Sequence, residues 1–431
     1  MSIQNHNTIY GLITHMFSSF VTKYGIYILL SIAFAPALIT VVTKAYGPVE
    51  NFGLNILYYH VGYETGFGGR KLLATFCHLI FPSFVKLRYI RTMVLAINFI
   101  MVALFIIFVG RCFRNNKNDA SLFSVLLIYA VGPFSLIAFI TSGLSVAFTE
   151  TYQISWTLLW LLLWTKYSGR WPFYIATLFI TVICCLHHHT FCCELFPLYV
   201  GLFAYDIIEN NGLNIKNIIG YGIVCTVLFA LLVVIWKFSR MTIDIDQLNE
   251  WLKNHAAVDA YECSRKAQTA YYYISNDENR ASMASYFTWN QRYGEFVVSI
   301  ILMSPLLFMI FYPWVRASHA APSRLLSWRY RLTWMLITIV TLPIFFMATD
   351  YNRWFICFFF SMFAATMSVV AIGDTILTNA IKTMSIFLMK HPYYAFALVI
   401  YAIGLHCTPF GAEYSLKEAL DLWTFIQGVH L

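Results

Sequence analysis

An acidic and a basic residue lie three positions apart between two long apolar runs late in the chain. These residues are Asp350 and Arg353, and Trp354 follows directly. A charged side chain at the mouth of a membrane helix is costly, so it usually marks a functional site or a structural ion pair. We predict that Asp350 takes part in catalysis and that Arg353 and Trp354 bind substrate. The simpler interpretation is that Asp350 and Arg353 pair with each other at a helix end.

A glycine-rich segment, Gly66–Lys71, ends in the two adjacent cations Arg70 and Lys71. Its glycines leave backbone N–H groups accessible, and cations beside them at the start of a helix suit a phosphate or pyrophosphate group. The segment lacks the Gly-Lys-Ser/Thr ending of a nucleotide-binding P-loop. We predict that Arg70 and Lys71 are phosphate ligands, and a flexible turn is the structural alternative.

Two carboxylates are placed where helix mouths are expected. Glu64 precedes the glycine-rich segment, and Glu150 stands at the start of a later apolar run. A carboxylate half-buried at a helix mouth can have its pKa raised into a range that suits a general base. Both residues are therefore candidate catalytic bases. The structural alternative makes either one the salt-bridge partner of Arg70 or Arg353.

A run of three histidines, His187–His189, is followed by Glu194 at the junction of two apolar runs. Adjacent histidines on a helix point in different directions, so at most two of them can share one metal ion. The spacing also matches no standard zinc motif. We predict neither a metal nor another cofactor, and we assign His189 to substrate contact. A metal site that includes Glu194 is the alternative.

The composition indicates a membrane protein. Of the 431 residues, 60% are hydrophobic and only 11% are charged, whereas a soluble chain of this length needs far more charge on its surface. Apolar runs of about 17–22 residues recur, which is the length that a helix needs to cross the hydrocarbon layer. The net charge of +8 is dispersed over the ends of these runs, so it does not indicate nucleic-acid binding. We predict an all-α polytopic integral membrane protein, with residues 1–431 as a single transmembrane domain.

About eleven transmembrane helices are expected from the apolar runs. They are Tyr24–Val42, Thr92–Val109, Ser121–Ile140, Thr149–Trp164, Trp171–Leu186, Cys193–Ala204, Ile218–Trp236, Val297–Tyr312, Leu332–Ala348, Trp354–Ile372 and Tyr393–Ile403. Lys and Arg concentrate in the short connections after the second, fourth and eighth of these runs. Because short cytoplasmic loops are rich in Lys and Arg, those connections are predicted to be cytoplasmic. All the candidate site residues then face the other side of the membrane.

The same orientation places two long connections, residues 43–91 and 237–295, on the outer face. The first contains an amphipathic stretch whose apolar residues are predicted to lie in the membrane interface, while Lys71 and His78 face water. The second is the most hydrophilic part of the chain. It contains a short helix, for which Asp244 or Asp246 is the predicted N-cap.

An outer site with cations, carboxylates and aromatic surface suits a glycan carried on a polyprenyl phosphate or pyrophosphate. Arg70, Lys71 and Arg353 would hold the phosphate, and Glu64 or Asp350 would deprotonate the acceptor hydroxyl. The arginines would stabilise the negative charge that develops on the leaving lipid phosphate. This chemistry requires no nucleotide.

The segments Gly66–Leu73 and Asp350–Trp354, together with the topology, resemble bacterial membrane proteins of surface-polysaccharide gene clusters. These include O-antigen or capsule polymerases and GT-C-like glycosyltransferases that use lipid-linked sugars. The resemblance implies a bacterial inner-membrane enzyme whose base is an acidic residue in the first outer loop, where Glu64 or Glu50 matches by position. The acidic pair typical of GT-C enzymes is missing here.

Two other classes remain open on the sequence. A lipid-linked glycan flippase or other secondary transporter places charges nearer the mid-membrane and contains internal repeats, and the sequence shows neither feature. A membrane O-acyltransferase would use one of His187–His189 as its base. Its acyl donor comes from the cytoplasm, which disfavours a histidine run on the outer face.

Overall fold

The fold is an all-α bundle with two short β-hairpins, which confirms the predicted class. The structure is a computed structural model. It describes residues 3–414 apart from 69, 82–84, 116–120, 144, 147–148, 211, 257–260, 263, 266–291, 348–350 and 409–410, and its side-chain description begins at residue 25. Asp350, the first predicted catalytic residue, lies outside the described residues.

The elements of the first half follow one another closely along the chain. They are α1 (Ile3–Tyr46), the 3-10 helices η1 (Val49–Tyr59) and η2 (Tyr63–Thr65), α2 (Leu72–Ile80), α3 (Leu87–Asn115), α4 (Ser121–Val131), α5 (Leu136–Thr141), α6 (Thr149–Tyr167), α7 (Trp171–His187), α8 (Phe191–Glu194), α9 (Phe196–Ile207), β1 (Ile208–Glu209) and β2 (Gly212–Leu213). The second half contains α10 (Ile215–Phe238), α11 (Ile245–His255), α14 (Arg292–Ala320), α15 (Arg324–Met347), α16 (Tyr351–Ala371), α17 (Thr375–Lys390), α18 (Pro392–Gly404), β3 (Leu405–Thr408) and β4 (Gly411–Tyr414). Each strand pair is antiparallel.

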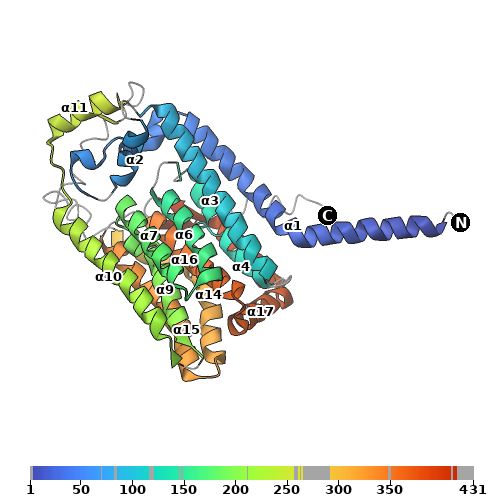
Figure 1. The fold of residues 1–431 in the computed structure, drawn as a ribbon. Coiled ribbons are helices and arrows are strands. Elements are labelled where there is room, and N and C mark those ends of the chain that lie inside the picture. Colours follow the sequence, from blue (N-terminus) through green and yellow to red (C-terminus); the bar gives the residue numbers. More distant parts are fainter. Residues whose placement is uncertain are drawn as a thin grey trace.

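Helix α16 is the centre of the bundle (Figure 1). Its apolar window, Asn352–Ala371, is buried over its whole length, and α3, α6, α9, α15 and α17 pack around it. A helix that is apolar on all sides favours such a position, because no face has to meet water. At about 1.5 Å per residue, its 21 residues join the two ends of the bundle. Arg353 lies in its first turn.

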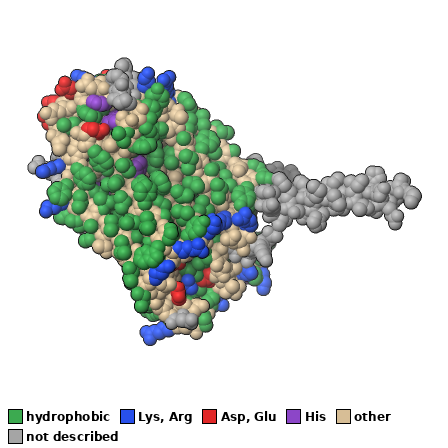
Figure 2. Space-filling model, viewed as in Figure 1, with side chains coloured by type: hydrophobic (Ala, Val, Ile, Leu, Met, Phe, Trp, Pro, Cys, Tyr) green, Lys and Arg blue, Asp and Glu red, His purple; other side chains and the backbone are tan. Residues whose placement is uncertain are grey.

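Five helices are long and apolar enough to cross a membrane: α1 from Gly25, α3, α10, α14 and α16. A sixth is obtained if α17 and α18, which meet at a 99° bend, count as one broken span. Figure 2 shows the corresponding wide hydrophobic belt, with Lys and Arg side chains gathered toward its two ends. The structure thus supports a membrane protein, but it does not confirm eleven spans.

Some predicted transmembrane spans are interrupted or too short in the structure, and the causes are local. The predicted span Ser121–Ile140 is broken into α4 and α5 by a turn, in which the Ser135 hydroxyl accepts a hydrogen bond from Ala138 N at 3.2 Å and so caps α5. Helices α7 and α9 are apolar but have only 17 and 12 residues. Broken and short helices at membrane depth are tolerated where neighbouring protein satisfies their backbone groups.

The two long connections pack against each other at one end of the bundle. Arg240 N, which follows α10, donates to Phe67 O at 3.0 Å, and Trp251 Nε1 of α11 donates to His60 O at 3.2 Å. A glycine is required at position 66, because its φ of +123° and a Cβ 2.5 Å from Arg240 O would exclude a side chain. Figure 1 shows α2 and α11 together at the upper end. Helix α11 begins with a capping box at Asp244, one of the two predicted caps.

The prediction that Lys71 and His78 face water is wrong. Lys71 is 2% exposed, and the His78 side chain is 12% exposed. Both residues are enclosed because α2 packs beneath η1 and η2 instead of lying alone on a surface. The exposed residues of α2 are apolar: Phe76, Leu79 and Ile80. This exposed face is suited to a membrane interface, as the sequence predicts.

The tight packing of α9 against α15 at Gly201 gives a stability prediction. A Cβ on Gly201 would lie 2.6 Å from Ile337 Cγ1 and 2.8 Å from Thr333 O, whereas a Cβ on Gly222 of α10 would meet nothing within 4 Å. We expect Gly201→Ala to destabilise the protein by about 1–3 kcal/mol, since a buried backbone atom has to move. Thermal unfolding in detergent measures the change. The matched Gly222→Ala variant should unfold like the wild type, and equal effects of the two substitutions would contradict this packing.

Candidate functional site

A buried ion pair joins α16 to α6 at one end of the bundle. Arg353 Nη1 lies 2.7 Å from Glu150 Oε1, and the two side chains are 14% and 2% exposed. Removing two charges from water is costly, so such a pair forms only where the geometry is good and the remaining polar atoms are satisfied. The pair therefore fixes the mouth of α16 against the start of α6. Of the predicted pair Asp350 and Arg353, only Arg353 lies within the described structure.

Arg70 reaches the same end of the bundle from the glycine-rich segment. Its Nε donates to His188 Nε2 at 2.8 Å. The Thr190 backbone N–H donates to the other ring nitrogen, His188 Nδ1, at 3.2 Å, and the Thr190 hydroxyl also contacts this nitrogen. Gln153 Nε2 donates to His188 O at 2.9 Å and so holds the backbone of the histidine. The guanidinium of Arg70 is thus bound to a neutral acceptor.

The backbone of Arg70 is strained. Its φ is +76°, and Arg70 is the only non-glycine residue with positive φ in the described part of the chain. A side chain in this region costs on the order of 1–3 kcal/mol and persists only where the surrounding structure imposes it. The strain turns the chain so that Arg70 is directed to His188 while the next residue, Lys71, is the N-cap of α2. Strain of this kind is concentrated at functional sites.

Glu194 adds a second carboxyl group to this cluster. It is 1% exposed, both of its oxygens are closed to solvent, and it interacts electrostatically with Glu150, Arg353 and Arg70. Two carboxylates in one buried site do not both carry charge without cost. Because Glu150 pairs with Arg353, Glu194 is the carboxyl group best placed to hold or release a proton.

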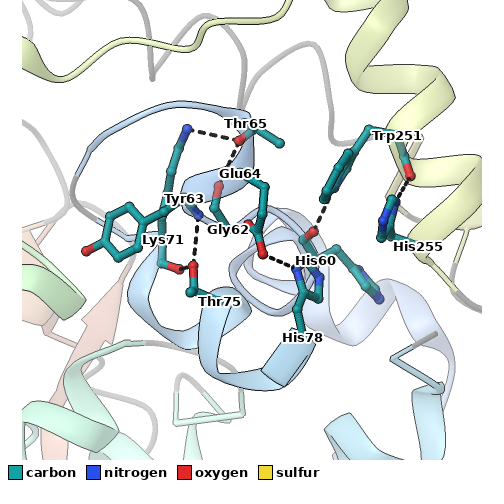
Figure 3. Close-up of polar contacts among 10 residues, drawn as sticks. All are labelled: His60, Gly62, Tyr63, Glu64, Thr65, Lys71, Thr75, His78, Trp251 and His255. Carbon is teal, nitrogen blue, oxygen red and sulfur yellow. Dashed lines mark hydrogen bonds and ion pairs between the residues drawn. The ribbon is translucent and has the colours of Figure 1, made fainter. Parts of the chain in front are cut away.

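Glu64 and Lys71 belong to a neighbouring set of contacts (Figure 3). Glu64 Oε1 lies 2.9 Å from His78 Nδ1. The Lys71 ammonium donates to Thr65 Oγ1 and to Gly66 O, each at 3.0 Å. No hydrogen bond or ion pair between described residues joins Glu64 or Lys71 to the cluster around Arg70. Lys71 stabilises the loop that carries Arg70.

The structure therefore brings together part of the predicted site. Arg70, Glu150 and Arg353 converge, and the His189 ring stacks on His188 at 5.3 Å. Trp354 is 2% exposed and packs edge-on against Phe345 in the bundle, so its ring is not open to a sugar.

Gln153 and Thr190 are not among the site residues predicted from the sequence. Glu194 is predicted only as a ligand of the alternative metal site. Gln153 was detectable as a lone amide in an apolar run, a kind of residue that usually satisfies another buried polar group. Thr190 gave no signal of its own. Within the described residues, no group of three or more His, Cys, Asp or Glu side chains is arranged to hold a metal ion.

Burial of Lys71 predicts a pH-dependent stability. Burial lowers the pKa of Lys71 from 10.5 to about 8, and the Glu64 carboxylate opposes the shift. Between these pH values the unfolded chain binds more protons than the folded chain, so the free energy of unfolding rises with pH. We expect this rise to be smaller in Lys71→Met than in the wild type when unfolding is measured at about pH 8 and about pH 10.5. Lys253→Met, which changes an exposed lysine of α11, serves as the control. An identical pH dependence in all three proteins would contradict a charge penalty at Lys71.

The cluster contains two guanidinium groups, two carboxyl groups and a neutral imidazole at one end of a buried helix. Arg70 forms no ion pair with any described residue, and its guanidinium donates to an uncharged imidazole. Such a site can bind an anionic group and can transfer a proton to or from a neighbouring hydroxyl.

Comparison of the chain with protein-family models, with curated proteins and with solved structures finds no match.

Proposed function

We propose that the protein is a membrane-embedded glycosyltransferase or polysaccharide polymerase that uses a glycan linked to a polyprenyl phosphate or pyrophosphate. Its active face is the non-cytoplasmic side of a bacterial inner membrane. The observation that carries the proposal is the convergence of Arg70 and Arg353, from segments far apart in the chain, around one buried carboxyl group.

The charge partners of the two arginines support the proposal that the substrate carries an anionic group. Arg353 is neutralised by Glu150 at 2.7 Å, while Arg70 donates to the uncharged acceptor His188. An arginine without a counter-ion at a half-buried position is held at a cost unless a ligand supplies the negative charge. A guanidinium also matches phosphate geometry by offering two parallel N–H donors. Arg70 is thus the proposed principal ligand of the lipid phosphate, and Arg353 is the second.

The proposed reaction is a displacement at the anomeric carbon of the lipid-linked sugar. The acceptor hydroxyl oxygen forms a bond to that carbon, and the bond from the carbon to the phosphate oxygen breaks. The leaving phosphate gains negative charge, which Arg70 stabilises. The hydroxyl proton passes to a carboxylate, for which Glu150 and Glu194 are the candidates within the described site. Glu64, the base suggested by resemblance, is bound to His78 instead.

The neighbouring helix α2 supports a lipid carrier. It begins two residues after Arg70, and Phe76, Leu79 and Ile80 are 54%, 78% and 51% exposed. Apolar side chains on a helix beside a charged loop are suited to the boundary between lipid headgroups and acyl chains. A polyprenyl chain lying along this face would bring its phosphate to the level of Arg70.

A reconstitution experiment tests the function. The protein in liposomes is supplied with a polyprenyl-phosphate-linked or polyprenyl-pyrophosphate-linked sugar and an acceptor glycan, and release of the lipid phosphate is measured. We expect release in the wild type and at least about a hundredfold less in whichever of Glu150→Gln and Glu194→Gln removes the base, because general-base catalysis contributes about 10²–10⁴-fold. Glu209→Gln, an exposed change at the β1–β2 hairpin, is the control. Arg70-dependent movement of the intact lipid across the bilayer, without release, would identify a transporter instead.

A further inference from the structure

A second polar cavity lies at the opposite end of α16 from the Arg70–Arg353 cluster. Its volume is about 600 Å³, and it is lined by the start of α15, the junction between α16 and α17, and Tyr205 of α9. Because α16 has 21 residues, the cavity is about 30 Å from the first site along the helix. The reaction proposed above makes no use of it.

Arg329 is the cation of this cavity, and its orientation is fixed by Tyr205. Arg329 Nε donates to Tyr205 O at 2.8 Å, and the guanidinium carbon lies 3.6 Å from the centre of the Tyr205 ring. These two contacts use the inner nitrogen and one face of the guanidinium. The two terminal nitrogens have no hydrogen-bond or ion-pair partner among the residues that the structure describes, and Arg329 lines the cavity.

The carboxylate that lines the cavity, Asp374, forms no ion pair with Arg329. Asp374 Oδ2 accepts hydrogen bonds from the Tyr205 and Tyr330 hydroxyls at 2.5 and 2.8 Å. Its Oδ1 accepts from Leu377 N at 2.8 Å and caps α17. Both carboxylate oxygens of Asp374 therefore accept hydrogen bonds from within the fold, and Asp374 forms no ion pair with Arg329.

The remaining lining is suited to a phosphate with an apolar attachment. Ser323 and Thr375 supply hydroxyl groups, and Leu326 and Ile376 supply apolar walls. A guanidinium with free terminal N–H groups binds phosphate through two parallel hydrogen bonds. We propose that this cavity binds a phosphate ester, with Arg329 as its principal ligand, supplied either as a lipid headgroup or as a small soluble phosphate. The site is independent of the proposed transferase reaction.

The binding test uses the full-length protein in detergent and three probes. They are a short-chain phosphatidic acid, inorganic phosphate, and the matching short-chain diacylglycerol, which lacks the phosphate. We expect the phosphatidic acid to bind and the diacylglycerol not to bind. Arg329→Gln should weaken binding at least about tenfold, since it removes charge-assisted hydrogen bonds. Arg331→Gln should leave binding unchanged, because Arg331 is placed over the Trp328 ring and does not line the cavity.

A second variant separates binding from folding. Thr375 is exposed at the start of α17, so Thr375→Trp should fill the cavity mouth and abolish binding while thermal unfolding stays unchanged. Competition by inorganic phosphate would assign the site to small soluble phosphates, and its absence would assign the site to a lipid headgroup. The proposal is overturned if none of the probes binds. It is also overturned if Arg329→Gln and Arg331→Gln weaken binding equally, or if Arg329→Gln and Thr375→Trp both bind like the wild type.

Discussion

Replacing Arg353 with methionine is expected to destabilise the protein by about 3–5 kcal/mol, because it leaves Glu150 buried without its counter-ion. Glu150 is 2% exposed and its contact with Arg353 measures 2.7 Å, so water cannot replace the lost partner. The variant should also lose glycosyl transfer. Thermal or denaturant unfolding in detergent measures the first effect, and lipid-phosphate release measures the second.

A double substitution separates the loss of stability from the loss of glycosyl transfer. Apolar residues of similar size in place of a buried ion pair are often neutral or stabilising. Glu150→Leu combined with Arg353→Met should therefore be clearly more stable than either single variant, and yet inactive. Arg88→Met, at an exposed arginine of α3, controls for loss of charge. If the two single losses simply add in the double variant, the pair is not coupled as described.

Arg70→Gly is expected to lose activity while keeping the stability of the wild type. A glycine adopts the φ of +76° without strain, so the variant should unfold at or near the wild-type temperature. It loses the guanidinium that donates to His188. We expect at least about a hundredfold slower transfer, which is the scale found when a group that stabilises a developing oxyanion is removed.

Two comparisons interpret that result. Arg70→Lys keeps the charge but lacks the Nε donor and the paired N–H groups of a guanidinium, so it should recover only part of the activity. Gly68→Ala changes the same segment without removing a charge, although its Cβ would come within 2.7 Å of the Ser239 hydroxyl. Normal transfer by Arg70→Gly would show that Arg70 does not bind the phosphate.

The sequence predicted the class of protein because the bilayer imposes strong constraints on it. Apolar runs, their lengths and the position of charges at their ends follow from the cost of burying polar groups in hydrocarbon. The same constraints identified Arg70, Glu150 and Arg353 as unusual residues. They did not define which apolar runs stay unbroken, since one predicted span is divided by a turn in which Ser135 caps the start of α5.

The partners within the site could not be assigned uniquely from the sequence, because they depend on which distant helices become neighbours. Arg353 is 203 positions from Glu150, and Arg70 is 118 positions from His188. Local spacing suggested Asp350 as a partner of Arg353 and left Glu150 as an alternative, and tertiary packing places Glu150 against Arg353. Lys71 was misjudged for the same reason, since its burial depends on η1 and η2 folding over α2.

The most direct test of the proposed function is an experimental structure of the protein in lipid with a bound polyprenyl-phosphate-linked sugar. We predict phosphate density within hydrogen-bonding distance of the Arg70 guanidinium and beside Arg353, with the sugar next to Glu150 or Glu194. The polyprenyl chain should lie along the exposed face of α2. A phosphate found away from Arg70, at a saturating concentration of a substrate that the protein turns over, would contradict the account.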